Sequence, residues 1–320
     1  MVNSVKKTAF IFPGQGAQRV GMGRELYDRY ACAKSIFSKA DELMGIKLSD
    51  IVFNGPETEL RKTEITQPAV FTVSMICLEV LKEKGVVPDV VAGHSLGEYS
   101  ALAASGSVDF EDCLKLVIKR GEFIKKASAE NPGTMAAIIG IGEKEVIAIC
   151  DKVNAGGKGR AVLAVNFNSP IQVVVSGTEA GCGEAVEKAK AAGAKKAAVL
   201  KVSGPFHHAD FMAPARVLLE EELKGYNFRN AVRPIVANFS ASPVTDGESI
   251  KESIIKQMNS PVLWEKSVLR MIQEGVYAFV EVGPGKVLSG LLRRISKDAA
   301  VLNVEDEATL EETLKAIVNI

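Results

Sequence analysis

Histidine is scarce in this sequence of 320 residues, which has three, at positions 94, 207 and 208. Cysteine is little more frequent, with five residues, none of them close to another in the sequence. An odd and scattered set of cysteines favours reduced thiols in a cytoplasmic protein over a disulfide framework or a zinc site. We therefore expect a cytoplasmic location and no metal ion.

An excess of charge of either sign is also missing, because 39 basic residues balance 39 acidic ones. That balance argues against an extended nucleic-acid footprint or a polybasic membrane surface. Long apolar runs are lacking as well. The longest, at 69–81, contains Glu79 and is too short to span a bilayer, and the run near the N-terminus breaks at Pro13, too early for a signal peptide. We expect a soluble protein with no nucleic-acid partner and no membrane partner.

An alternation of buried strands and helices is what the sequence does contain. Continuous apolar runs at 8–12 and 90–93 predict strands that are covered on both faces. Thr66 can cap a helix that has Pro68 in its first turn and Gly85 at its end. Strands that alternate with helices indicate a mostly parallel sheet. The helices are expected at 21–44, 66–85, 96–106 and 110–129.

The pattern changes within 131–202, where the order becomes strand, helix, strand, strand, helix, strand. This order is typical of the split βαβ or ferredoxin-like arrangement. We expect a small subdomain at 131–202 inserted into a large α/β subdomain formed by 1–130 and 203–320. The parallel sheet is expected to resume at 233–240 and 277–283. The segments of the small subdomain are 134–141, 143–153, 161–165, 171–177, 178–193 and 195–202, and a last helix is expected at 308–320.

Ser95 lies in the segment GHSLG (93–97), which has the G-x-S-x-G form of a nucleophile elbow. The required context is strand, sharp turn and helix, and the flanking segments supply it. Glycine on both sides allows a tight turn and a close approach of other chains. The serine would lie at a helix N-terminus, where free N–H groups favour a developing oxyanion. The alternative is a structural Gly-Ser turn.

A serine hydroxyl needs a base, and only the three histidines are candidates. His94 adjoins Ser95 in the turn, where we expect its side chain to point elsewhere. His207 and His208 lie where the chain re-enters the large subdomain, and their residue types alone do not separate them. A base that is distant in sequence and close in space is normal for this chemistry. The alternative, a paired-histidine metal site, lacks ligands at suitable spacing beyond Asp210.

The glycine-rich turn FPGQGAQ (12–18) follows the first predicted strand. It lacks the Lys-Ser/Thr pair of a phosphate-binding P-loop. At the carboxyl end of a parallel strand it would lie on the same side of the sheet as the serine turn, where such sheets bind ligands. Its N–H groups can therefore contribute to an oxyanion hole.

Nine short motifs, in this order along the chain, carry a resemblance to a known family. The motifs are FPGQGAQ, TQPAVF, GHSLGEYSALAASG, RGEFI, GTMAAI, NFNSPIQVVVSG, PFHH, NSPVLW and EVGPGKVL. With them the sequence closely resembles the malonyl-CoA:acyl carrier protein transacylases of fatty acid synthesis and the related acyltransferase domains of polyketide synthases, from about residue 8 to 295. The implied fold is a hydrolase-like parallel-sheet core with an inserted ferredoxin-like subdomain, in agreement with the periodicity.

The resemblance assigns catalytic roles to individual positions. Ser95 resembles the nucleophile that becomes malonylated, and His207, directly after a phenylalanine, resembles the base. In the family a backbone carbonyl orients that histidine, and Gln257 is the matching residue, so Glu98 is not expected to complete a triad. Gln15 and Leu96 resemble the residues whose backbone N–H groups form the oxyanion hole.

The resemblance also implies how the acyl group is recognised. Arg120 matches the arginine that pairs with the malonyl carboxylate, and a guanidinium suits a carboxylate because it makes two charge-assisted hydrogen bonds. Gln67 and Asn168 are further pocket candidates, although each can instead satisfy loop backbone. Phe206 resembles the form that selects malonyl over methylmalonyl groups. The sequence departs from many relatives at 124–125, which puts the shape of the pocket wall in doubt.

The function implied is transfer of malonyl from malonyl-CoA to the phosphopantetheine thiol of acyl carrier protein, through a malonyl-serine intermediate. No cofactor is expected, since malonyl-CoA is a substrate. The alternatives are a serine esterase or thioesterase of related fold, a polyketide-pathway acyltransferase, and a catalytically silent subunit that binds carrier protein.

Overall fold

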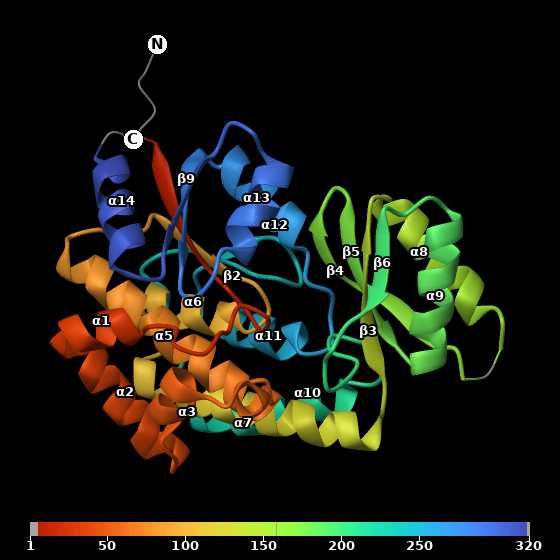
Figure 1. The fold of residues 1–320 in the computed structure, drawn as a ribbon, viewed down its shortest axis with the longest axis horizontal. Coiled ribbons are helices and arrows are strands. Elements are labelled where there is room, and N and C mark those ends of the chain that lie inside the picture. The colour runs from red at the N-terminus through yellow and green to blue at the C-terminus, as the bar shows by residue number, and fades with distance from the viewer. Residues whose placement is uncertain (1–5, 158, 319–320) are drawn as a thin grey trace.

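Two β-sheets organise the structure (Figure 1), a computed structural model that describes residues 6–157 and 159–318. The larger sheet has six strands, and all of its neighbouring strands pair in parallel except the last two. A mostly parallel sheet is what the alternation of strands and helices predicted. In order across the sheet the strands are β10 (Ala300–Val304), β9 (Val276–Val282), β1 (Lys7–Phe12), β2 (Val90–Gly93), β7 (Ile235–Val236) and β8 (Pro243–Val244).

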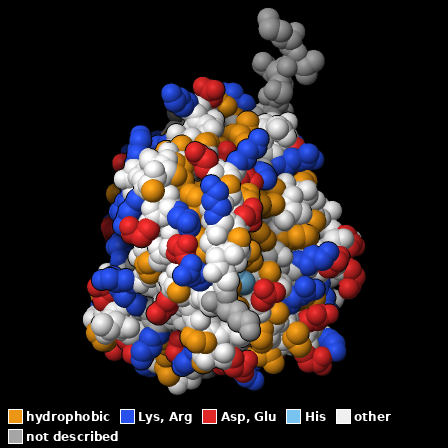
Figure 2. Space-filling view, turned by 90° about the vertical axis from the view of Figure 1, so that its right-hand side faces the viewer, with side chains coloured by type: hydrophobic (Ala, Val, Ile, Leu, Met, Phe, Trp, Pro, Cys, Tyr) orange, Lys and Arg blue, Asp and Glu red, His pale blue; other side chains and the backbone are white. Residues whose placement is uncertain are grey.

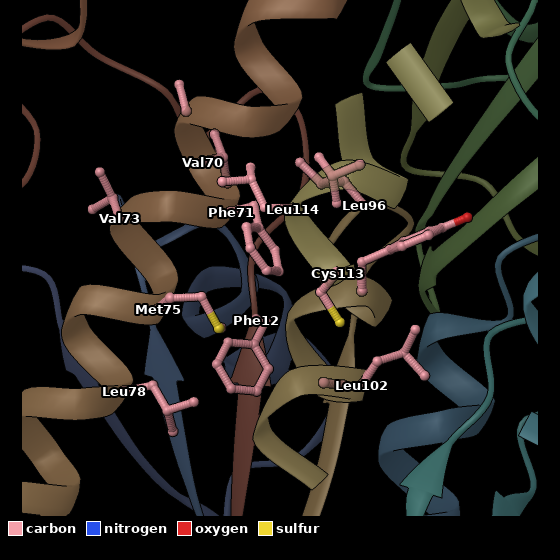
Figure 3. Close-up of a cluster of buried hydrophobic side chains, with 14 of the residues drawn as sticks. Phe12, Val70, Phe71, Val73, Met75, Leu78, Leu96, Leu102, Cys113 and Leu114 are labelled. Carbon is pink, nitrogen blue, oxygen red and sulfur yellow. The ribbon is translucent and has the colours of Figure 1, made fainter. Parts of the chain in front are cut away.

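Helices cover both faces of the larger sheet, which explains why the four buried residues of strand β1 (9–12) are all apolar. Phe10 and Phe12 face the core formed with α5 (Thr63–Glu83), α6 (Gly97–Ser105) and α7 (Phe110–Glu130). Ala9 and Ile11 face the opposite core, formed with α12 (Trp264–Gln273) and α13 (Val287–Ile295). Figure 3 shows Phe12 between side chains of α5 and of α6. A strand buried on both faces cannot alternate apolar with polar residues.

Helix α5 is the central helix of the larger core. It is long and apolar enough to cross a membrane by length and composition alone, yet 89% of its most apolar window is buried inside the molecule. The apolar run at 69–81 is therefore the middle of a longer helix of 21 residues. A helix that is hydrophobic all round and covered by protein is a core helix.

The smaller sheet has four antiparallel strands in the order β4-β5-β3-β6. Helices α8 (Glu143–Asn154) and α9 (Glu179–Ala191) pack on one of its faces, at the right of Figure 1. This is the ferredoxin-like order, and the expected fold class is confirmed. All four strands lie within 131–202, while the subdomain limits themselves stay a prediction. The strands are β3 (Thr134–Ile139), β4 (Val162–Ser169), β5 (Gln172–Gly177) and β6 (Lys196–Val199).

The edge strand β4 joins the smaller sheet to the rest of the molecule. The N–H of Phe167 donates to the Val262 carbonyl at 2.9 Å, and the N–H of Val262 donates to the Val165 carbonyl at 2.7 Å. Backbone hydrogen bonds of this kind fix the position of the smaller sheet beside the larger one. Figure 2 shows acidic and basic side chains interspersed around a band of hydrophobic side chains on this side of the molecule.

Three expectations about single elements are wrong. The segment 21–44 forms two helices, because Tyr30 is extended with φ of −110° and ψ of 131° and its hydroxyl contacts Glu307 of a distant helix. Helix α5 begins at Thr63, so Thr66 does not cap it and donates to the Leu60 carbonyl instead, and Pro68 lies inside the helix rather than in its first turn. The two helices within 21–44 are α1 (Arg24–Arg29) and α2 (Ala31–Met44).

The third correction concerns 233–240, where only the two residues of β7 form a strand. The chain turns directly after Val236, which ends the strand there and brings Asn238 to the serine turn. The sequence also gave no indication of β10. The remaining elements are α3 (Leu48–Asn54), α4 (Glu57–Leu60), α10 (Ala213–Glu222), a 3₁₀ turn (Leu223–Gly225), α11 (Gly247–Gln257) and α14 (Glu307–Ile317).

Candidate active site

Ser95 lies on a sharp turn between β2 and α6, with a positive φ of 52°. That backbone conformation is uncommon for a residue with a side chain and persists only where its surroundings enforce it. Close packing does so here, because a Cβ on Gly93 would overlap the Gly97 backbone and one on Gly97 would overlap the Phe12 carbonyl. The N–H of Ser95 donates to Oδ1 of Asn238 at 2.7 Å. The turn is therefore held from both sides with its hydroxyl directed into a cavity.

His207 lies against the serine, with its Nε2 atom 2.7 Å from Oγ of Ser95. Its Nδ1 atom is 3.1 Å from the carbonyl oxygens of both Gln257 and Ser260. Since a carbonyl only accepts, Nδ1 carries the proton and Nε2 is left as an acceptor. Burial, with the nearby Arg120 cation as the second cause, lowers the pKa of His207 to about 3. The neutral ring is thus ready to take a proton from the hydroxyl.

Arg120 of α7 is the third group at the serine, and it is only 2% exposed. Its Nη1 donates to Oε1 of Gln67 at 2.8 Å, and its Nη2 donates to Oγ of Ser95 at 3.1 Å and to Oε1 of Gln257 at 3.3 Å. Among the residues that the structure describes, no carboxylate pairs with it. Burial lowers the pKa of Arg120. The buried Glu98 offsets part of the cost of this buried cation from beyond ion-pair distance, and a ligand that brings a carboxylate into direct contact would offset more of it.

A cavity of about 300 Å³ opens in front of these three side chains. Its polar end is formed by the serine turn and Arg120, and its walls are mostly apolar side chains from the smaller sheet and from α13. A mostly apolar pocket with a few placed polar groups is typical of a small-molecule site. The lining includes Gln15, Gln67, His94, Ser95, Arg120, Met135, Asn168, Val174, Leu200, Phe206, His207, Leu288 and Leu291.

The backbone N–H groups of Gln15 and Leu96 have no hydrogen-bond acceptor among the residues described. Gln15 lies in the turn after β1, and its side chain donates to the Thr63 hydroxyl at 3.3 Å. Leu96 directly precedes α6, where N–H groups have no partner within the helix. Two free donors beside a serine are the elements of an oxyanion hole.

The other two histidines have different surroundings. His94 lines the cavity and its Nε2 is 2.8 Å from Oδ1 of Asn168 on β4, with its ring edge-on to Trp264. The side chain of Asn168 therefore contacts another side chain, that of His94, rather than loop backbone. His208 is stacked on Phe211 and accepts from the N–H of Asp210 at 3.3 Å. His207 is therefore the histidine that reaches Ser95, and the two neighbours are separated by geometry.

Sequence reasoning missed two residues at this site and set a third aside. The backbone carbonyl of Ser260, like that of Gln257, lies 3.1 Å from Nδ1 of His207 and helps to orient its ring. Oδ1 of Asn238 accepts the N–H of Ser95. Glu98, which we did not expect in a triad, indeed contacts Gln257 and Asn238 rather than the histidine. The motif NSPVLW contained Ser260, but no pattern in the sequence indicated Asn238.

The described part of the chain contains no group of three or more His, Cys, Asp or Glu side chains arranged to hold a metal ion. The site brings together a serine hydroxyl, a histidine ring with Nε2 as acceptor, two backbone N–H groups without acceptors among the described residues, and a buried guanidinium.

The chain is similar over almost its whole length to known acyltransferases. Residues 9–313 match the family described as acyl transferase domain. A malonyl CoA-acyl carrier protein transacylase of Bacillus subtilis is 44% identical over 98% of each chain. An acyl carrier protein S-malonyltransferase structure from Vibrio cholerae superposes with a TM-score of 0.91 at 40% identity, covering 96% of this chain and 100% of that one. A malonyl-transacylase in complex with a type II polyketide synthase acyl-carrier protein gives a TM-score of 0.93 at 38% identity, covering 97% and 100%.

Proposed function

This chain belongs to the acyl transferase domain family, and from that premise we propose that it is a malonyl-CoA:acyl carrier protein transacylase. It moves a malonyl group from malonyl-CoA to the phosphopantetheine thiol of acyl carrier protein and so supplies extender units for fatty acid synthesis. The observation that carries the proposal is the buried Arg120, which lacks a carboxylate partner among the described residues and donates to Ser95.

The first half-reaction acylates the serine. Oγ of Ser95 attacks the thioester carbonyl as its proton passes to Nε2 of His207, which lies 2.7 Å away. The N–H groups of Gln15 and Leu96 stabilise the oxyanion that forms. The intermediate collapses by breaking the carbon–sulfur bond, and coenzyme A leaves with the proton from His207. The product is a malonyl-serine ester with a neutral histidine beside it.

The second half-reaction reverses these steps with a different thiol. The phosphopantetheine thiol of acyl carrier protein gives its proton to His207 and attacks the ester carbonyl. The same N–H groups stabilise the second oxyanion, and the ester bond to Ser95 breaks as Oγ recovers the proton. The carbonyls of Gln257 and Ser260 keep the ring in place throughout, since both accept from Nδ1 at 3.1 Å.

Arg120 gives the reaction its acyl specificity. A malonyl carboxylate supplies the counter-ion that the guanidinium lacks, and Gln67 keeps the guanidinium in the plane of the site by accepting from Nη1. A carboxylate held at the end of the acyl group orients the ester for the incoming thiol. Neutral acyl groups would leave the buried cation unpaired, which disfavours them.

Intact-mass analysis tests the proposal. Wild-type protein mixed with malonyl-CoA should gain one malonyl group, which peptide mapping should place on Ser95. Addition of holo acyl carrier protein should then discharge the label onto the carrier thiol faster than water does. Ser95→Ala should not be labelled, and removal of such a nucleophile typically lowers turnover by about 10⁴- to 10⁶-fold.

Two of the alternatives, the thioesterase and the silent carrier-binding subunit, give different results in the same experiment. Rapid loss of the label to water, with none on the carrier, would identify a thioesterase. Absence of any label on Ser95 would identify a silent carrier-binding subunit. A cytoplasmic location and a reaction without cofactor or metal ion are parts of the proposal, as is the subdomain division at 130/131 and 202/203.

A further inference from the structure

Glu98 is a buried carboxylate beside the catalytic pair that the mechanism above does not use. It lies in the first turn of α6, three residues after Ser95, and is 1% exposed. Its Oε2 accepts hydrogen bonds from the Gln257 side-chain Nε2 at 3.0 Å and from the Asn238 N–H at 3.2 Å. These two partners come from segments that lie more than a hundred residues further along the chain.

Gln257 connects Glu98 to His207 through its backbone carbonyl, which accepts from Nδ1, and to Arg120 through its side-chain amide. Its Nε2 also donates to the Ser95 carbonyl at 2.6 Å, while its Oε1 accepts from Nη2 of Arg120 at 3.3 Å. A flipped amide would place Oε1 against two acceptors, the Ser95 carbonyl and Glu98, and Nε2 against the arginine. Glu98 therefore helps to fix which end of the Gln257 amide faces Arg120.

Asn238 connects Glu98 to the serine turn. Its Oδ1 accepts the Ser95 N–H at 2.7 Å, and its Nδ2 donates to the Gly93 carbonyl at 2.6 Å. The side chain of Asn238 thus holds both ends of the G-x-S segment, and the backbone N–H of the same residue donates to Glu98. The left-handed backbone of Ser95 needs such support, because an isolated chain would not keep it.

We propose that Glu98 is a positioning residue of the acyl transfer. It fixes the Gln257 amide and the Asn238 backbone, and through them it sets the serine turn and the orientation of the malonyl-binding Arg120. The inference rests on the proposed function, because it assigns Arg120 to the malonyl carboxylate. It assigns no proton transfer to Glu98, whose described hydrogen-bond partners do not include His207.

The test compares two substitutions at Glu98 with a matched control. Glu98→Ala removes the acceptor, so kcat/KM for malonyl-CoA should fall roughly ten- to hundredfold, as expected for loss of hydrogen bonds to a charged group. Glu98→Gln keeps one acceptor oxygen and should restore most of that loss. Because Arg120 loses its orientation in Glu98→Ala, the preference for malonyl-CoA over acetyl-CoA should fall as well.

Glu281 provides the control, since it is a second buried glutamate near the cavity and none of its described hydrogen-bond partners is Ser95, His207, Arg120, Gln257 or Asn238. Its two oxygens accept the N–H groups of Leu288 and Ser289 at the start of α13, at 3.0 and 2.7 Å. Glu281→Gln should lower the melting temperature and leave the malonyl/acetyl preference unchanged. Rates are normalised to the folded fraction measured by circular dichroism.

A double-mutant cycle separates positioning from a general loss of structure. Because Glu98 acts largely through Gln257, Glu98→Ala combined with Gln257→Leu should lose less activity than the sum of the two single losses. Additive losses would overturn the proposal, as would an unchanged malonyl/acetyl preference in folded Glu98→Ala. These readouts are ratios between variants, whereas failure of the proposed function would appear in the wild-type protein as the absence of a malonyl-serine.

Discussion

Nη2 of Arg120 donates a hydrogen bond to Oγ of Ser95 at 3.1 Å. The hydroxyl is therefore shared between a cation and the base, His207, which lies 2.7 Å away. A carboxylate that binds Arg120 competes for the donors that now contact the serine. Substrate binding and exposure of the nucleophile are coupled at this one contact, which makes the arginine the most informative position to change.

Replacing Arg120 by alanine should separate malonyl from neutral acyl groups. The malonyl carboxylate would be buried without a partner, and hydrogen bonds to charged groups contribute about 1.5–3 kcal/mol each. We expect kcat/KM for malonyl-CoA to fall by roughly tenfold to a few hundredfold. Acetyl-CoA should lose less or gain, because no buried cation then opposes it. Steady-state assays with both substrates measure the difference.

Arg120→Lys and Lys119→Ala are the controls for that comparison. Lysine keeps the charge without the two-pronged geometry, so it should recover only part of the malonyl activity. Lys119 is adjacent in sequence but exposed and paired with Glu122 at 2.9 Å, so its loss should have little effect. Equal losses for malonyl-CoA and acetyl-CoA in Arg120→Ala would mean that the arginine supports the fold rather than reading the carboxylate.

The pH dependence of acylation should reflect the surroundings of His207. Burial and then Arg120 lower its pKa from 6.5 to about 3, so the free enzyme holds a neutral base throughout the neutral range. With Glu98→Gln, which removes the buried carboxyl whose pKa burial raises to about 7, the kcat/KM for malonyl-CoA should stay level as the pH falls through 6.5 and decline only as it approaches the lowered pKa of His207. Rapid-quench measurement of acyl-enzyme formation at each pH gives the profile.

Two variants support the assignment of that profile to one histidine. His207→Ala should lower acylation strongly at every pH. His208→Ala should lower it little, because His208 is stacked on Phe211 and accepts the backbone N–H groups of Asp210 and Phe211 in its own turn. An inflection near 6.5 that persists in Glu98→Gln, or a larger loss in His208→Ala, would contradict the geometry.

Glu98 should make the stability of the fold depend on pH. Burial raises its pKa from 4.5 to about 7. The native state thus keeps a proton that the unfolded state releases at lower pH. The contribution of this group to the free energy of unfolding is fully present below 4.5 and is lost as the pH rises towards 7. Urea titrations of wild type and Glu98→Gln should show a difference that shifts in favour of the variant over this range.

Strands that are buried on both faces could be predicted, because burial on both faces requires apolar residues at successive positions. Strands β1 and β2 are apolar at nearly every position and buried on both faces, so a run of apolar residues was sufficient to locate them. The break at Tyr30 could not be predicted in this way. It depends on a contact with Glu307, and local periodicity contains no information about a residue at the other end of the chain.

The part of the site around Ser95 was predictable, because one short motif contains all the residues that its sharp turn requires. The segment GHSLG contains both the serine and the glycines that let its turn pack, so Ser95 was located from five residues. Asn238 and the role of Glu98 were not predictable. Their function arises only when β2, α6, α11 and the turn after β7 meet, and each of these residues is ordinary within its own segment.

The last prediction concerns Phe206, which lines the cavity and packs against the apolar wall of the smaller sheet formed by Met135, Val165 and Val174. Methylmalonyl-CoA carries one more methyl group, which a hydrophobic wall discriminates by about 1–3 kcal/mol. Phe206→Ser should therefore lower the preference for malonyl-CoA over methylmalonyl-CoA by roughly tenfold or more, as measured by competition for the serine in intact-mass spectra. Phe211→Ser is the control, since Phe211 stacks on His208 outside the cavity lining and should leave the preference unchanged. If Phe206→Ser lowers both rates equally, the discrimination comes from another part of the pocket wall.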